Sequence, residues 1–294
     1  MNYDIAFLGH ICFDEVVPFQ ADRTVRPGSA VLCGAMAAAR VGRKVAAIVK
    51  MSPADDRILQ PMRDAGIRTL LIPAPQTSHM VVIHPSADVD DRRMFLKKNA
   101  GHIRIDEVPA IDAAHLHLAG ISDQEFTLDL IRGLLGRGHN LSADAQSFVR
   151  QVDPATCEVH FRDVSAKREI VSLLQKVKLD VVEARLLTGH DDLERAALEV
   201  ESWGCGEIMI TEGKGVLARA GGTTYYEKFT NRSVVGRTGR GDTTFAGYLA
   251  WRMEHGPAES LKFAAALVSI KMETPGPFCG TLEDVLRRLL IADC

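Results

Sequence analysis

Short apolar runs that alternate with amphipathic stretches are the feature that most restricts the fold of this 294-residue chain. The apolar runs have the length of strands buried on both faces, and the stretches between them repeat their apolar residues at helical spacing. The predicted strands are 5–8, 45–49, 69–72, 115–118, 141–143, 179–182 and 207–210. The predicted helices are 30–41, 55–65, 125–135, 164–177, 193–203, 243–253, 258–272 and 282–290. Strand–helix alternation with right-handed crossovers predicts an α/β fold, a doubly wound, mostly parallel sheet with helices on both faces.

One region departs from this alternation. Residues 79–84 and 92–96 have the pattern of an antiparallel hairpin with a turn through 85–91. Together with an extended segment near the N-terminus, they predict a small β lid whose strands lie at about 13–26 and 78–97. The lid is an insertion in a single domain that spans residues 1–294. An ordinary edge hairpin explains the same pattern equally well.

Composition excludes several classes of protein. The formal net charge is -3 and the basic residues are scattered, which argues against a nucleic-acid partner. No apolar segment reaches the roughly 20 residues of a membrane span, and the first residues lack the basic region of a signal peptide. None of the six cysteines forms a C-x-x-C pair, which predicts reduced thiols in a cytoplasmic protein.

The segment Gly-Arg-Thr-Gly-Arg-Gly-Asp at 236–242 carries the chemistry, because a helical pattern follows it at once. Gly239, Arg240 and Gly241 would present backbone N–H groups at the positive end of a helix dipole, which is a favourable place for a phosphoryl group. The Asp242 carboxylate lies in the same small volume and is the candidate general base for a hydroxyl that attacks phosphorus. Taken alone, Asp242 is equally compatible with a plain helix-capping role.

Four segments, which follow one another along the chain in the family's order, resemble ribokinase-like (PfkB) carbohydrate kinases, and the resemblance covers nearly the whole chain. Residues 28–42 are similar to the first family signature, a glycine pair followed by a helix of small residues. Residues 236–242 are similar to the second signature, roughly D-T-x-G-A-G-D. Residues 180–183 resemble the family's N-x-x-E element, and 211–215 its T-x-G turn.

The resemblance implies an ATP-dependent kinase for a small polyhydroxylated substrate, with Mg²⁺ and, in some members, a monovalent cation. It assigns the nucleotide to Thr211, Gly213 and Lys271. It assigns Mg²⁺ to Glu183 and Asp180, which we expect to act through water, since Mg²⁺ keeps much of its hydration. The residues that the resemblance places around the substrate are Asp14, Gly28, Ser29 and Cys33.

Other side chains near strand ends are open to two interpretations. Asp144, Gln146 and Arg150 either face the site or belong to a surface loop. His115 and His117 are taken to point to opposite sides of one strand, and no metal or Ser-His-Asp site is expected.

Departures from the family pattern bear on the substrate. Cys33 stands where the family has a sugar-contacting asparagine, and Gly236 replaces its first acidic residue. These changes put ribose and fructose in doubt as the acceptor. Residues 142–146, taken together with 236–242, resemble a bacterial subgroup for which a polyol-like or inositol-like acceptor is expected. A nucleoside kinase and a catalytically silent sugar-binding protein are the alternatives. Lids of this family often pair across a dimer, and the outward apolar residues Val81 and Ile83 predict a homodimer through the lid.

Overall fold

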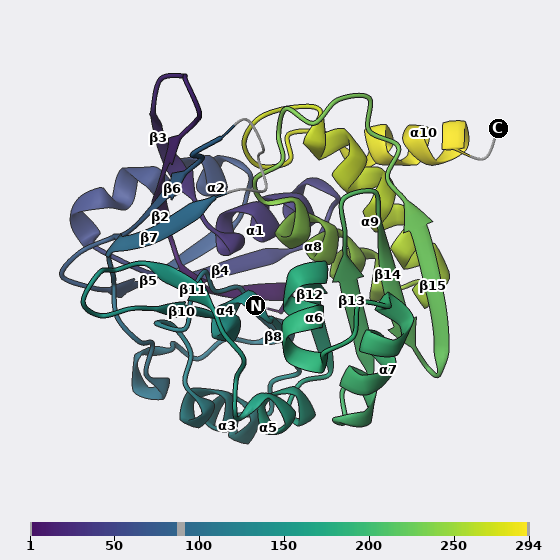
Figure 1. Cartoon of the computed structure of the whole chain (residues 1–294), viewed down its shortest axis with the longest axis horizontal. Coiled ribbons are helices and arrows are strands. Elements are labelled where there is room, and N and C mark those ends of the chain that lie inside the picture. Colours follow the sequence, from purple (N-terminus) through teal and green to yellow (C-terminus); the bar gives the residue numbers. More distant parts are fainter. Residues whose placement is uncertain (1, 87–91, 293–294) are drawn as a thin grey trace.

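A nine-stranded sheet forms the centre of the computed structural model, which describes residues 2–86 and 92–292 (Figure 1). The strand order is β15-β14-β13-β12-β9-β8-β1-β4-β5. Neighbours from β5 to β13 are parallel, whereas β13-β14 and β14-β15 are antiparallel. The strands are β1 (Tyr3–His10), β4 (Val45–Met51), β5 (Arg68–Pro73), β8 (Ala113–Leu118), β9 (Leu141–Asp144), β12 (Lys176–Asp180), β13 (Glu207–Thr211), β14 (Gly215–Ala220) and β15 (Thr223–Lys228). The predicted mostly parallel α/β fold is confirmed.

Helices cover both faces of this sheet, and each face has its own apolar core. Strand β1 shows why: Ile5 and Phe7 pack in one core, while Ala6 and Leu8 pack in the other. The first core is shared with α1 (Ala30–Arg40), α2 (Gln60–Asp64), α8 (Arg240–Arg252), α9 (Pro257–Met272) and α10 (Leu282–Ala292). The second is shared with α3 (Leu128–Gly136), α4 (Gln146–Val149), α5 (Lys167–Ser172), α6 (Val181–Thr188) and α7 (Leu193–Ser202).

A separate four-stranded sheet stands beside the main sheet, at the upper left of Figure 1. Its order is β3-β2-β6-β7, from β2 (Cys12–Val17), β3 (Thr24–Gly28), β6 (Ser78–Ile83) and β7 (Arg93–Lys98). The hairpin β6-β7 is antiparallel as predicted, but β6 pairs in parallel with β2. Most of the predicted turn at 85–91 lies outside the described residues. The small sheet is present where the sequence places it, and its movement as a lid stays a prediction.

Three predicted boundaries are wrong. The predicted helix 164–177 ends in the structure at Ser172, and β12 already starts at Lys176. The predicted strand 179–182 is shifted, because the Asp180 side chain caps the helix that begins at Val181. The predicted helix 55–65 is a 3₁₀ segment, η1 (Pro53–Leu59), that continues into α2.

Some short elements have no counterpart in the sequence analysis. They are the helices α4 and α6, the strands β14 and β15, the hairpin of β10 (Arg150–Val152) and β11 (Val159–Phe161), and the 3₁₀ turn η2 (Ile105–Glu107). β15 reads Thr-Thr-Tyr-Tyr-Glu-Lys, which lacks the apolar run of a strand buried on both faces. It is an edge strand, so that only part of its surface needs to be apolar.

Candidate active site

The Asp242 carboxylate lies in the first turn of α8, at the edge of the sheet where β9, β12 and β13 end. Gly239 is the residue that precedes the helix, with a left-handed φ of 79°. The Gln146 side-chain amide donates a hydrogen bond to Asp242 Oδ1 at 3.2 Å. Burial raises the pKa of Asp242, while the nearby Lys178 ammonium opposes that rise. Asp242 is therefore a partly buried carboxylate in a fixed orientation, as a general base requires.

Lys271 holds the loop that leads into α8. Its ammonium donates hydrogen bonds to the carbonyl oxygens of Gly236 and Thr238. A Cβ at position 236 would lie 1.8 Å from the Thr274 carbonyl oxygen, so that only glycine fits there. The departure at Gly236 thus follows from close backbone packing. Binding of a nucleotide by Lys271 stays a prediction, since its ammonium is already engaged by the loop.

Asp14 lies on β2 with its carboxylate oriented by two neighbours. The Cys12 thiol donates to Asp14 Oδ1 at 3.0 Å. A Cβ at Gly28 would come within 1.8 Å of Asp14 Oδ2, which means that glycine leaves the space the carboxylate occupies. Burial raises the pKa of Asp14, and the negative charge of Asp242 raises it further. Asp14, the candidate substrate-binding residue, and Asp242, the candidate general base, therefore lie in one electrostatic environment.

Ser29 and Cys33 belong to the start of α1. The Ser29 hydroxyl caps this helix by accepting from the Leu32 N–H at 3.1 Å, so its established contact is structural. Cys33 packs against the candidate catalytic loop, residues 236–241, because a Cβ at Gly239 would meet its Sγ at 2.5 Å. Burial raises the pKa of the Cys33 thiol to about 12, which keeps it neutral.

A buried ion-pair network beneath Asp242 was missed by the sequence analysis. Lys178 Nζ lies 3.5 Å from Asp144 Oδ1, and His117 Nε2 lies 3.3 Å from Asp144 Oδ2. A Cβ at Gly241 would meet Lys178 Nζ at 3.0 Å and Thr211 Oγ1 at 3.7 Å. Neighbouring carboxylates raise the pKa of Lys178 although its burial opposes this, so the group remains a cation beside the loop. A lysine inside a buried strand was the available signal, since such a charge needs partners.

The orientation assigned to the two histidines of β8 is wrong. Residues two apart on a strand point to the same face. His115 Nε2 and His117 Nδ1 accordingly both contact Ser142 Oγ, at 2.7 and 2.9 Å. Asp144 and Gln146, whose positions were open, lie inside the site.

Asp180 and Glu183 hold the N-terminus of α6 by mutual capping. Asp180 Oδ1 accepts from the Glu183 N–H, and Glu183 Oε2 accepts from the Asp180 N–H, both at 2.8 Å. The other Glu183 oxygen is buried without a hydrogen-bond partner and lies 3.8 Å from Arg150. Burial raises the pKa of Glu183 to about 7. One unsatisfied carboxylate oxygen fits contact with a hydrated cation, and the described residues contain no cluster of three metal-ligating side chains.

Thr211 and Gly213, which the sequence analysis assigned together to the nucleotide, lie in different surroundings. Thr211 is buried at the end of β13, beside the catalytic loop. Gly213 lies in the exposed turn that joins β13 to β14. Arg240 is the first residue of α8. Burial lowers the pKa of Lys271, and the positive charge of Arg240 adds to this effect. Within the described residues no helix is long and apolar enough to cross a membrane.

Comparison with known proteins extends these observations. Residues 1–280 match the pfkB family of carbohydrate kinases. A solved pyrophosphate-dependent kinase of the ribokinase family is 32% identical, with 96% of this chain and 99% of that chain covered and a TM-score of 0.89. A second such structure, complexed with a pyrophosphate analog and myo-inositol, is 30% identical over 96% and 99% of the two chains, with a TM-score of 0.87.

A cytidine kinase of Thermococcus kodakarensis is 27% identical over 265 residues, which cover 87% of this chain and 91% of that protein. The ribokinase of Arabidopsis thaliana, complexed with ribose and ATP, shares the fold at 17% identity, 98% and 99% coverage and a TM-score of 0.77. The matched range, residues 1–280, contains both signatures and all the site residues described above. The chain therefore belongs to the pfkB family of carbohydrate kinases, phosphotransferases whose acceptor is a hydroxyl group.

Proposed function

We propose that the protein transfers a phosphoryl group to a hydroxyl of an inositol-like cyclic polyol. The observation that carries this proposal is the proximity of two carboxylates, Asp14 and Asp242, to the loop at Gly239–Gly241. A carboxylate accepts two hydrogen bonds, so Asp14 suits a pair of adjacent hydroxyls. Asp242 would then accept the proton of the hydroxyl that attacks phosphorus, and the loop N–H groups would stabilise the charge on the transferred group.

The donor that we propose is inorganic pyrophosphate. The family resemblance predicts ATP, but Arg240, the first residue of α8, stands where the family signature has alanine. A donor without a nucleoside is held by its phosphates alone, which requires more cationic groups near the loop. The relatives that are 30–32% identical and pyrophosphate-dependent support this choice. Mg²⁺, when bound near Glu183, would offset charge on the donor phosphates.

A substrate screen tests both parts of the proposal. The purified protein with Mg²⁺ is offered either pyrophosphate or ATP, with inositols, ribose, fructose or cytidine as acceptor, and phosphorylated product is measured by ³¹P NMR. We expect turnover with pyrophosphate and an inositol. Turnover with ATP and cytidine would instead favour the nucleoside-kinase alternative, which the cytidine kinase relative keeps open. Binding of acceptor without turnover from either donor would indicate a silent protein.

Replacement of the base tests the mechanism directly. Asp242→Asn should lower kcat by about 10²–10⁴-fold, the usual range for a lost general base. The matched control is Asp129→Asn, a side chain that is 93% exposed in the first turn of α3. Full activity of Asp242→Asn would remove Asp242 from the mechanism. The cytoplasmic location and a requirement for a monovalent cation stay predictions.

A further inference from the structure

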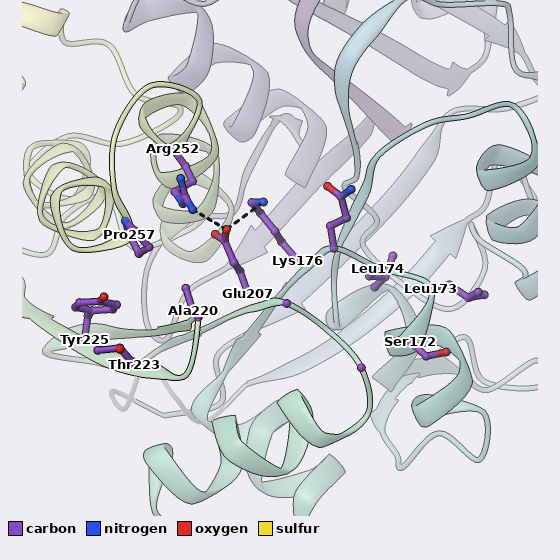
Figure 2. A pocket seen from close by; sticks show the side chains of 14 residues that line it. Ser172, Leu173, Leu174, Lys176, Glu207, Ala220, Thr223, Tyr225, Arg252 and Pro257 are labelled. Carbon is purple, nitrogen blue, oxygen red and sulfur yellow. Dashed lines mark ion pairs between the residues drawn. The ribbon is translucent and has the colours of Figure 1, made fainter.

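A hollow of about 640 Å³ opens at the amino-terminal edge of the sheet, where β12 and β13 begin (Figure 2). Small-molecule sites commonly have volumes of roughly 300–1,000 Å³. The hollow lies at the edge opposite Asp242. Arg252, which lines the hollow, follows Asp242 by ten positions on α8, so about 15 Å of helix axis lies between them. The hollow is therefore distinct from the reaction centre.

An ion-pair cluster forms the floor of this hollow. Glu207 Oε1 lies 3.4 Å from Lys176 Nζ and 3.2 Å from Arg252 Nη2, as the dashed lines of Figure 2 mark. The Tyr248 hydroxyl donates to Glu207 Oε2 at 2.7 Å. One carboxylate thus stands between two cations, and the charged residues that line the hollow carry a net charge of +1. Lys176 has further N–H donors beyond this one long ion pair, and its side chain is partly exposed.

The walls combine hydroxyl groups with small residues. Thr223 and Tyr225 lie on one side of the Glu207–Lys176 pair in Figure 2, and Ser172 lies on the other. Gly206 keeps the wall open, because a Cβ there would meet only the Gln175 carbonyl oxygen, at 3.5 Å. Polar walls of this kind match a ligand that carries hydroxyl groups as well as charge.

We propose that this hollow is a second ligand site, which binds a small hydroxylated phosphomonoester such as a sugar phosphate. The dianionic phosphate would contact Lys176 and Arg252, because a double negative charge gains more from the two cations than a single carboxylate does. The hydroxyl groups would face Thr223, Tyr225 and Ser172. This site does not depend on the proposed reaction, since none of its residues belongs to the catalytic loop.

The test uses glucose 6-phosphate as probe and the backbone amides of Gly204, Gly206 and Gly221, which line the hollow, as reporters. Their ¹⁵N–¹H signals are followed during titration of the full chain without any phosphoryl donor. We expect saturable shifts, and an at least tenfold weaker apparent affinity in Lys176→Gln, about the loss of one charged contact. Lys228→Gln, an exposed lysine on β15, is the matched control and should bind as the wild type does.

A second variant keeps the test decisive if Lys176→Gln does not fold. Gly206→Leu places a side chain in the wall, where the space around Cβ permits it, and should abolish the shifts. Glucose alone and inorganic phosphate alone should each bind at least tenfold more weakly than glucose 6-phosphate. Shifts confined to Gly239 and Gly241, equal binding of inorganic phosphate, or no shifts at all would each overturn the proposal. Because no turnover is measured, these outcomes are independent of the donor and acceptor proposed for the catalytic site.

Discussion

Single atoms decide how the Asp14 carboxylate is held. The Cys12 thiol contacts one of its oxygens, and the absent side chain of Gly28 leaves room for the other. Gly28 of the first signature is thus a glycine because a side chain there would meet the Asp14 carboxylate. Ser29, the next residue, caps the helix that follows. The substitution at Cys33 places a neutral thiol between the acceptor side and the Gly239 turn.

Gly28→Ala should therefore impair acceptor binding more than folding. The new methyl group must displace the Asp14 carboxylate, and a misplacement of about 1 Å costs on the order of 10²-fold in catalytic efficiency. We expect kcat/KM for the acceptor to fall by about 10–100-fold, measured by initial rates. Gly136→Ala is the control, because a Cβ there meets nothing within 4 Å. Equal kinetics of the two variants would show that Asp14 does not hold the acceptor.

His115 makes the stability of the fold dependent on pH. Burial lowers the pKa of His115 from 6.5 to about 3. Below about pH 6.5 the unfolded chain takes up a proton that the folded chain refuses, so the free energy of unfolding falls as the pH decreases. Between pH 7 and 5 this residue should account for a loss of about 2 kcal/mol.

His115→Gln, which retains a polar group beside Ser142, should abolish this part of the pH dependence. Urea denaturation at pH 7 and pH 5 measures it, with His190→Gln, on the exposed surface, as control. The same loss of stability in wild type and His115→Gln would contradict the assignment.

Two helices, α1 and α8, join the two sides of the candidate site, the proposed acceptor side at Asp14, Gly28 and Cys33 and the proposed catalytic side at Asp242. They pack against each other, and their ends meet where Gly239 touches Cys33. The left-handed φ of Gly239 and this contact both exclude a side chain. The start of α8 is consequently fixed by its own turn and by α1.

Gly239→Ala should lower both stability and kcat. Gly138→Ala separates the two causes, because Gly138 has a similar φ of 82° and nothing within 4 Å of its Cβ position. We expect Gly138→Ala to cost about 1 kcal/mol of stability from backbone strain alone. Gly239→Ala should cost more and reduce kcat at least tenfold, with partial recovery in the double variant Cys33→Ala/Gly239→Ala. Unchanged kcat in Gly239→Ala would mean that the turn does not position the reacting groups.

The sequence predicted the elements that repeat a simple pattern and the residues that carry family signatures. The buried parallel strands and the helix after Asp242 were identified from periodicity alone. Lys178 and His117 were not assigned to the site, because their role depends on Asp144, which reaches them only when β8, β9 and β12 pair side by side. β15 was missed because an exposed edge strand needs no apolar run. Local patterns report burial, whereas these contacts arise from pairing over long distances in sequence.

At the scale of the whole molecule, the small sheet presents partly exposed apolar side chains. Val81 and Ile83 of β6 are only partly buried, whereas Met80 packs in the apolar core of that sheet. The exposed residues Phe19 and Val25 extend the apolar surface of the same region. This arrangement agrees with the predicted homodimer through the lid, which stays a prediction.

Charged residues on this surface should separate the two copies. Val81→Glu/Ile83→Glu is expected to convert a dimer to a monomer in sedimentation-velocity experiments, since a buried unpaired charge opposes association. Leu198→Glu is the control and should remain dimeric, because Leu198 is 43% exposed on α7, which lies apart from the small sheet in Figure 1. A wild-type protein that stays monomeric at high concentration would contradict the predicted homodimer.

The two sides of the catalytic site come from opposite ends of the chain. Asp14, Gly28 and Cys33 precede β4, whereas Lys178, Asp242 and Lys271 follow β9. A ribosome therefore makes Asp14, Gly28 and Cys33 before β4, and it reaches Asp242 only after β9, β12 and β13 have been made. A nascent chain cannot turn over its donor, because competence begins only after α8 has docked onto α1.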